Sequence, residues 1–324
     1  MSTTSPEPAA KRGSPLLQWA GVAVSLVCVA AVVWWAAKQP APDLPDTRED
    51  VGALLLAILL YGVATALRAE RWKILIHDQG GDMPRADAYG LTVVGYMGNN
   101  VLPARGGDVF RVMLGAPRSD ASRRTVIGTL LAERLLDIAV LVVLFVVLAV
   151  TIAHGAGLPE GRTLTWLLVG AAIALVCLAV AVLTLHRRGL LAKVRAFVAP
   201  MLASTLALRG RHGATMVAIT MLIWTVEAGV WGSVGAAANI DMSVLESFYL
   251  VALASMFSMI PSGPGYAGTQ DAAAVIGIKA IGGTSSAAVS YLILVRFVLL
   301  VPITAAGLVL VATRYGGLKR LRTA

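Results

Sequence analysis

Two long apolar stretches of this 324-residue chain are each interrupted in mid-run by proline and glycine. One interruption lies within residues 95–108 and the other within residues 259–268. In lipid every backbone N–H and C=O group must be hydrogen-bonded inside the protein, so a broken helix persists at membrane depth only where protein or a wet cavity surrounds it. Paired interruptions in two halves of a membrane chain are typical of a transport site.

The apolar residues come in blocks that are long enough to cross a bilayer. Hydrophobic residues make up 57% of the chain and charged residues 14%. A hydrocarbon core of about 30 Å requires roughly 20 apolar helical residues. The sequence therefore predicts an all-α polytopic membrane protein with about six full spans, at residues 16–37, 51–67, 126–153, 163–185, 215–237 and 286–312.

The positive charges predict the orientation of these spans. Most of the 27 Lys and Arg residues lie in segments 1–15, 68–125, 186–213 and 313–324. Because basic segments remain in the cytoplasm, we expect an integral protein of the cell (inner or plasma) membrane with both termini cytoplasmic.

The two interrupted regions, 86–116 and 244–283, then each enter and leave on one side as re-entrant helical hairpins, from opposite faces. This arrangement is an inverted-topology repeat. In the alternative, each region crosses twice as two short helices, which gives about eight or more helices.

The chain divides into three expected parts. Residues 1–14 are a disordered cytoplasmic tail, and residues 15–45 hold an N-terminal anchor helix and an outer loop. Residues 46–324 form the transmembrane domain. Its expected parts are repeat one at 51–153, a connecting span at 163–185 and repeat two at 215–312.

Charged and amide side chains gather around the first interruption. Glu133 and Asp137 are four residues apart and share a helix face, where two carboxylates require a neighbouring cation. We expect a network that locks the hairpin, contact with a substrate, or both. The candidate residues here are Asn99, Asn100, Arg105, Asp108, Arg111, Glu133, Arg134 and Asp137. Asn99 and Asn100 are interpreted as helix caps or headgroup ligands, and free N–H groups at Gly106 and Gly107 suit a phosphate.

The second interruption has its own polar residues. Gln270 and Asp271 open the helix after the turn, and Glu227 and Arg296 are placed near mid-bilayer by counting from the span ends. Isolated charges at that depth are costly, so we expect the latter two to pair with each other or with the hairpins. Arg68, Arg71, Trp72 and Lys73 are interpreted as an interfacial anchor. The hairpin turns are predicted at Pro103, Gly106, Gly107, Pro261, Gly263, Pro264, Gly265 and Gly268.

Several functional classes find no support in the sequence. The basic residues form no arm suited to nucleic acid, and Cys28 and Cys177 lie singly inside apolar runs without metal-ligand spacing. There is no Walker-type phosphate-binding motif. We therefore expect no metal, no cofactor and no nucleic-acid partner.

These residues resemble the transmembrane region of lysylphosphatidylglycerol synthetases, also called flippase-like membrane proteins. The resemblance covers most of the chain after about residue 50. It is carried by residues 68–72, Asn100, Leu102, Pro103, Ala104, Gly107, Asp108, Arg111, Glu133, Arg134, Asp137 and residues 261–268. Asp108 and Asp271 stand where many relatives are expected to carry Glu. No aminoacyl-transfer domain follows the last span in this sequence, so the resemblance implies no aminoacylation of lipid by this chain.

The resemblance implies a transporter rather than an enzyme, one that flips or scrambles a lipid or lipid-linked headgroup between leaflets. The cargo class is phospholipid or polyprenyl-phosphate-linked lipid. The alternative is a membrane enzyme, or an accessory subunit or scaffold, of phospholipid or lipid-linked sugar synthesis. The small residues Gly229, Gly232 and Gly235 permit close helix packing, either within the chain or in a homodimer. A partner from cell-envelope biosynthesis is a further expectation.

Overall fold

The computed structural model describes residues 44–102, 105–153, 211–258 and 263–316, with a few positions between 30 and 42. These residues are helical, and no strand occurs among them. The expected tail at 1–14, most of the anchor at 15–45 and the connecting span at 163–185 lie outside the described residues. The elements are α2 (Arg48–Asp78), α3 (Arg85–Val101), α4 (Gly106–Gly115), η1 (Ala116–Arg118), α5 (Arg123–Ala153), α8 (Arg211–Ala237), α9 (Val244–Phe257), η2 (Pro264–Tyr266), α10 (Thr269–Ala280) and α11 (Ser285–Thr313).

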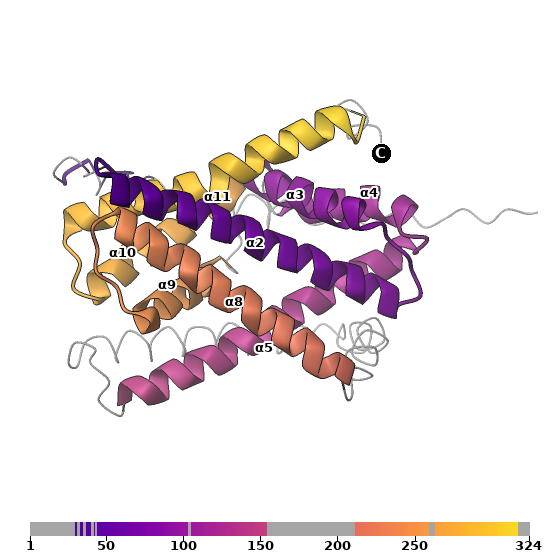
Figure 1. The fold of residues 1–324 in the computed structure, drawn as a ribbon, viewed down its shortest axis with the longest axis horizontal. Coiled ribbons are helices and arrows are strands. Elements are labelled where there is room, and N and C mark those ends of the chain that lie inside the picture. The colour runs from indigo at the N-terminus through magenta and orange to yellow at the C-terminus, as the bar shows by residue number, and fades with distance from the viewer. Residues whose placement is uncertain are drawn as a thin grey trace, which may run out of the picture.

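The order of a long helix, a pair of short helices and a second long helix occurs twice (Figure 1). The first set is α2, α3 with α4, and α5; the second set is α8, α9 with α10, and α11. The short pairs fall where the hairpins at 86–116 and 244–283 are expected. Three described helices, α2, α8 and α11, are long and apolar enough to cross a membrane. Six full spans and re-entrance of the short pairs stay predictions.

Equivalent long helices of the two sets run in opposite directions in Figure 1. Along the α2–α8 contact, Leu60 lies beside Gly229, whereas Arg71, further along α2, contacts Thr220, which comes earlier in α8. α3 and α11 are antiparallel in the same way. The two sets therefore interlock, because α3 of the first packs on α11 of the second.

Glycine lets α3 and α4 approach closely. A Cβ atom built on Gly107 would lie 1.7 Å from the carbonyl oxygen of Gly95, and one built on Gly98 would lie 2.6 Å from the Gly107 Cα. No side chain fits at such separations, so the backbones themselves are in contact. Small residues at helix interfaces permit this packing in membrane proteins. The first helix pair is thus held by backbone contact as well as by its turn.

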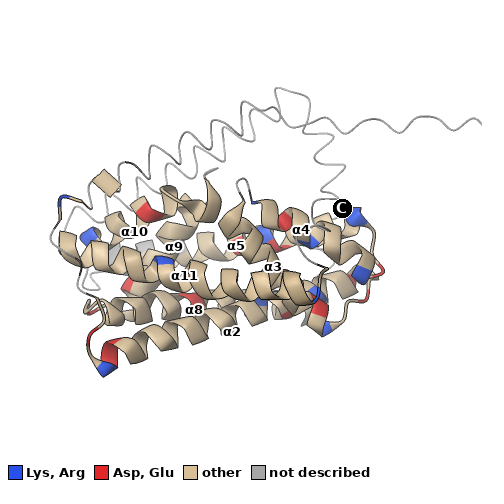
Figure 2. Cartoon of the chain, turned by 90° about the horizontal axis from the view of Figure 1, so that it is seen from above, with Lys and Arg blue, Asp and Glu red and all other residues tan. Residues whose placement is uncertain are grey.

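The distribution of side chains is inverted relative to a soluble protein. Large apolar side chains stand exposed on the outer faces, including Leu59 at 64% and Val309 at 61%. Charged side chains lie inside, including Arg71 at 1% and Glu133 at 4% exposed. Figure 2 shows the charges at the helix ends and at interior positions between mostly uncharged ribbons. Lipid covers such apolar faces, so the chain is an integral membrane protein.

One end of the helix bundle carries a cluster of charges outside the spans. Asp87 of α3 accepts hydrogen bonds from Arg314 Nε at 3.1 Å and Nη2 at 3.0 Å. Arg118 stacks over the Tyr315 ring at 5.1 Å from its centroid. Burial raises the pKa of the Tyr315 hydroxyl, and the Asp87 carboxylate adds to the shift. These contacts tie the end of α11 to α3 and η1.

Candidate functional site

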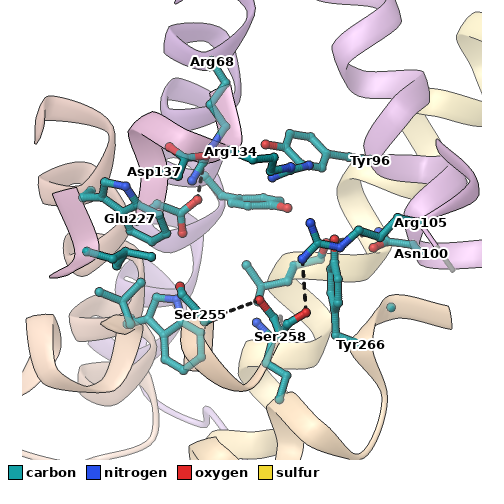
Figure 3. A pocket seen from close by; sticks show the side chains of 18 of the residues that line it. Arg68, Tyr96, Asn100, Arg105, Arg134, Asp137, Glu227, Ser255, Ser258 and Tyr266 are labelled. Carbon is teal, nitrogen blue, oxygen red and sulfur yellow. Dashed lines mark hydrogen bonds and ion pairs between the residues drawn. The ribbon is translucent and has the colours of Figure 1, made fainter. Parts of the chain in front are cut away.

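A cavity of about 360 Å³ lies in the middle of the bundle, where the turns of both helix pairs meet. Figure 3 shows its charged and aromatic side chains around a common space. Apolar residues of α5, α9 and α11 complete the wall. Its polar and aromatic lining comprises Tyr61, Arg68, Tyr96, Asn100, Arg105, Arg134, Asp137, Trp224, Glu227, Trp231, Ser255, Ser258, Tyr266 and Gln270.

Arg68 reaches the cavity because α2 is longer than its apolar run. The helix continues to Asp78, so Arg68 lies within it and is 9% exposed. Its Nη1 donates to Glu227 Oε1 of α8 at 2.5 Å. The interpretation of residues 68–73 as an interfacial anchor is therefore wrong for Arg68, Arg71 and Trp72, which are buried. Glu227 pairs with α2, and neither with Arg296 nor with a helix pair.

Arg71 is the centre of a buried network between α2, α5 and α8. Its guanidinium donates to both carboxylate oxygens of Asp137, at 2.7 and 3.2 Å, and to the Thr220 hydroxyl at 2.9 Å. Glu133 lies 3.9 Å away and is held more closely by Arg111 of α4, at 2.9 Å. Arg71 thus lies between the two carboxylates, and of the arginines near them in sequence, Arg111 pairs with Glu133 whereas Arg105 and Arg134 pair with neither. Sequence spacing does not reveal it, because α2 lies far from α5 along the chain.

Arg111 and Arg134 join α4 to its neighbours in different ways. The guanidinium of Arg111 stacks on Trp72, with its carbon 4.1 Å from the ring centroid, and is buried. Arg134 of α5 faces the cavity and meets Asp108 of α4 at 3.4 and 3.5 Å, in a looser and half-exposed pair. A cation–π contact therefore holds α4 of the first helix pair to α2, and ion pairs hold it to α5.

Arg105 connects the turns of the two helix pairs. It precedes α4 with a left-handed backbone, φ 56°. Its Nη2 donates to the Ser258 carbonyl, at the end of α9, at 3.2 Å, and its guanidinium carbon lies 5.4 Å from the centroid of the Tyr266 ring. Both contacts are visible in Figure 3. Among the described residues no carboxylate pairs with Arg105.

The two adjacent asparagines have separate roles. The side-chain oxygen of Asn99 accepts from the Gly107 N–H at 3.0 Å and so caps α4. The Gly107 N–H is therefore not free for a phosphate. Asn100 faces the cavity, and its amide nitrogen donates to the Thr304 hydroxyl of α11 at 3.1 Å.

Arg296 of α11 holds the turn of the second helix pair. Its Nε pairs with Asp271, and its Nη1 donates to the Gly265 carbonyl at 2.6 Å. Asp271 also accepts from the Gly268 N–H at 2.8 Å, at the start of α10. The expectation that Arg296 pairs with a hairpin corresponds to these contacts. Gly265, with φ 61°, and Gly268, with φ 86°, adopt backbones that favour glycine, whereas Pro103 and Pro261 lie outside the described residues.

The cavity brings together half of the residues predicted from sequence. Asn100, Arg105, Arg134, Asp137, Glu227 and Gln270 line it, whereas Asn99, Asp108, Arg111, Glu133, Asp271 and Arg296 are not part of its lining. Sequence reasoning missed the aromatic residues, because an aromatic side chain gives no signal against an apolar background. In the described part of the chain, no group of three or more His, Cys, Asp or Glu side chains is placed to hold a metal ion.

Comparison with known proteins assigns a family. The sequence profile of the family "Lysylphosphatidylglycerol synthase TM region" matches residues 18–307. A UPF0104 membrane protein of Pyrococcus horikoshii is 28% identical over 131 residues, which are 40% of this chain and 38% of that protein. The match thus spans well under half the length of this curated relative. No solved structure matches the chain.

Proposed function

The chain belongs to the lysylphosphatidylglycerol synthase TM region family, and from this premise we propose that it translocates a lipid or lipid-linked headgroup between the two leaflets of the membrane. The observation that carries the proposal is the charged cavity at the junction of the two helix pairs, inside a bundle whose outer faces are apolar. A headgroup occupies the cavity while its acyl or prenyl tails stay in the bilayer. The protein is then a transporter of the cell membrane, with cytoplasmic termini.

The arrangement of the two helix sets supports a mechanism of alternating access. Equivalent long helices run in opposite directions, as in transporters built from inverted repeats with a site at the repeat interface. The cavity takes residues from both sets, and Arg105 joins the turns of the two pairs. Rocking of one set against the other opens the cavity to one leaflet and then to the other. Breaking and remaking the Arg105 contacts accompanies this motion.

The alternative of a lipid-synthesising enzyme requires carboxylates that are free to act on a substrate. Three carboxylates of α4 and α5, Asp108, Glu133 and Asp137, are the candidates for that role, and each forms an ion pair with an arginine. A carboxylate held in this way already has its counter-charge, so its oxygens are less available to a substrate or a metal ion. This pairing favours translocation over catalysis at these positions.

Reconstituted protein tests the proposal. Fluorescent lipid in one leaflet of liposomes should exchange to the other leaflet faster with protein than without, and mass spectrometry should find the lipid unchanged. Ser255→Trp fills the cavity and should abolish exchange, whereas Val244→Trp, at a position 75% exposed, should not. A lipid product of new mass, or exchange that is unaffected by Ser255→Trp, would overturn the proposal.

A further inference from the structure

The charged residues at the cavity balance one another with one exception. Arg68 is matched by Glu227, Asp137 by Arg71, and Arg134 by Asp108. In the network behind the wall, Arg111 is matched by Glu133. Arg105 has only neutral partners among the described residues, namely the Ser258 carbonyl and the Tyr266 ring. The cavity therefore carries one positive charge that the described part of the protein does not compensate.

An uncompensated cation in a low-dielectric cavity attracts an anion. The guanidinium group offers several N–H donors in one plane, which match the oxygens of a phosphate better than an ammonium group does. Arg105 uses one of its terminal nitrogens for Ser258, and it lies half-buried at the cavity wall. The Tyr266 ring lies against the guanidinium, whose carbon is 5.4 Å from the ring centroid. Arg105 is thus oriented to receive an anionic ligand.

A second unpartnered donor lines the same cavity. The Trp224 side chain of α8 is buried, with the residue 7% exposed, and its indole N–H has no acceptor among the described residues. A buried donor without an acceptor is energetically costly, so such groups commonly meet a ligand or water. Trp224 also supports Arg68, whose guanidinium carbon lies 5.8 Å from its ring centroid. The cavity therefore contains the uncompensated Arg105 guanidinium and the unpaired Trp224 indole N–H, and both groups can donate hydrogen bonds to oxygen atoms of a ligand.

We propose that Arg105 binds the phosphodiester of the transported lipid at the junction of the two helix-pair turns, and that the Trp224 N–H donates to an oxygen of the same headgroup. This inference rests on the proposed function and adds the substrate class, a phosphodiester lipid rather than a phosphate-free glycolipid. The apolar part of the wall, formed by residues such as Ile138 and Leu141, faces the part of the lipid nearest its tails.

Binding and transport are measured separately to test the assignment. Detergent-purified protein is titrated with short-chain phosphatidylglycerol, with a glucosyl diacylglycerol of the same chains, and with inorganic phosphate, and thermal stabilisation is recorded. We expect stabilisation by phosphatidylglycerol alone. Arg105→Gln should weaken that binding at least about tenfold, as expected for loss of a charged hydrogen bond, and Arg105→Lys should restore part of it. Trp224→Phe should weaken it less.

The control is Arg123→Gln, which removes an equal charge from an exposed position at the start of α5 and should bind normally. Equal stabilisation by the glycolipid, or unchanged binding by Arg105→Gln, overturns the assignment. If inorganic phosphate stabilises the protein and phosphatidylglycerol does not, the site binds free phosphate, and the assignment of a lipid ligand is overturned.

Exchange assays in liposomes keep the two proposals apart. If the protein exchanges both lipids equally, translocation stands and the phosphodiester assignment falls. If it exchanges neither lipid but binds phosphatidylglycerol through Arg105, the assignment stands and translocation falls.

Discussion

Arg105 and Tyr266 lie against each other across the junction of the two helix pairs, with the guanidinium carbon 5.4 Å from the ring centroid. Both residues have left-handed backbones, with φ values of 56° and 55°. Such conformations cost non-glycine residues about 1–3 kcal/mol and persist where the surroundings hold them. The contact joins segments that are far apart in sequence, and it forms part of the cavity wall. Strain stored at this junction supports the proposal that the contact is released when the two helix sets move against each other.

Replacing the ring of Tyr266 tests the role of this contact. Tyr266→Leu removes the aromatic face, worth about 0.5–2 kcal/mol to a neighbouring cation, and should slow lipid exchange in liposomes severalfold. Tyr266→Phe keeps the face and should preserve the rate. Thermal unfolding should change little in Tyr266→Phe, whereas Tyr266→Leu should lose about 0.5–2 kcal/mol of stability with the contact. Equal rates for Tyr266→Leu and the wild type would show that the ring has no part in transport.

The elements of this fold follow from the sequence better than their contacts do. Apolar blocks and Pro/Gly interruptions place the helix pairs well, because span length and backbone breaks are local properties. Arg68 shows where this fails. The apolar run ends at Leu67, which predicts an interfacial position for Arg68, whereas the helix continues to Asp78 because buried partners stabilise the charges within it.

The cavity residues likewise fall into those that the sequence predicts and those that only the tertiary structure reveals. Arg105, Asp137 and Glu227 stand out as charges in an apolar chain and were identified from sequence. Tyr96 and Trp224 carry no such signal, and their place in the cavity depends on tertiary packing. Long-range pairing of Arg71 with Asp137 equally requires the fold to be known.

The pair of Arg68 and Glu227 should couple strongly in a double-mutant cycle. Removing one partner leaves a buried charge and should destabilise the protein by about 3–5 kcal/mol, because the remaining ion has no counter-charge. Arg68→Met with Glu227→Gln should cost clearly less than the sum of the single changes. The free energy of unfolding of the wild type, the two single variants and the double variant is measured by reversible unfolding in mixed micelles.

The exposed pair of Arg85 and Glu70 serves as the reference cycle. Its nitrogen–oxygen distance is 2.9 Å, but the Arg85 side chain is 75% exposed. Exposed pairs contribute about 0–1 kcal/mol, so its coupling energy should be small. Similar coupling in the two cycles would contradict the assignment of Arg68 and Glu227 to a buried, low-dielectric site.

Gly107→Ala should disrupt the first helix pair. The added methyl group would lie 1.7 Å from the Gly95 carbonyl oxygen, so the two helices must separate. We expect a loss of at least about 3 kcal/mol in the free energy of unfolding, at the upper end of overpacking costs. Gly62→Ala is the matched change in α2, where nothing lies within 4 Å of the new methyl group. It should stabilise the protein by about 1 kcal/mol, because alanine favours a helix. Equal effects at both positions would refute the close backbone contact.

Arg296→Lys tests whether the positive charge of Arg296 is sufficient or whether the geometry of its guanidinium group is also required. The wild-type guanidinium pairs with Asp271 and also donates to the Gly265 carbonyl, and a single ammonium group does not span both acceptors in the same way. Keeping the charge while losing the fork should cost about 1.5–3 kcal/mol of stability, as for a hydrogen bond to a charged group. It should also slow lipid exchange, because the turn beside Tyr266 is no longer held from α11. Arg314→Lys changes an exposed pair with Asp87 and should alter neither property. If Arg296→Lys behaves like Arg314→Lys, the charge alone is sufficient and the geometry of the turn does not depend on the guanidinium fork.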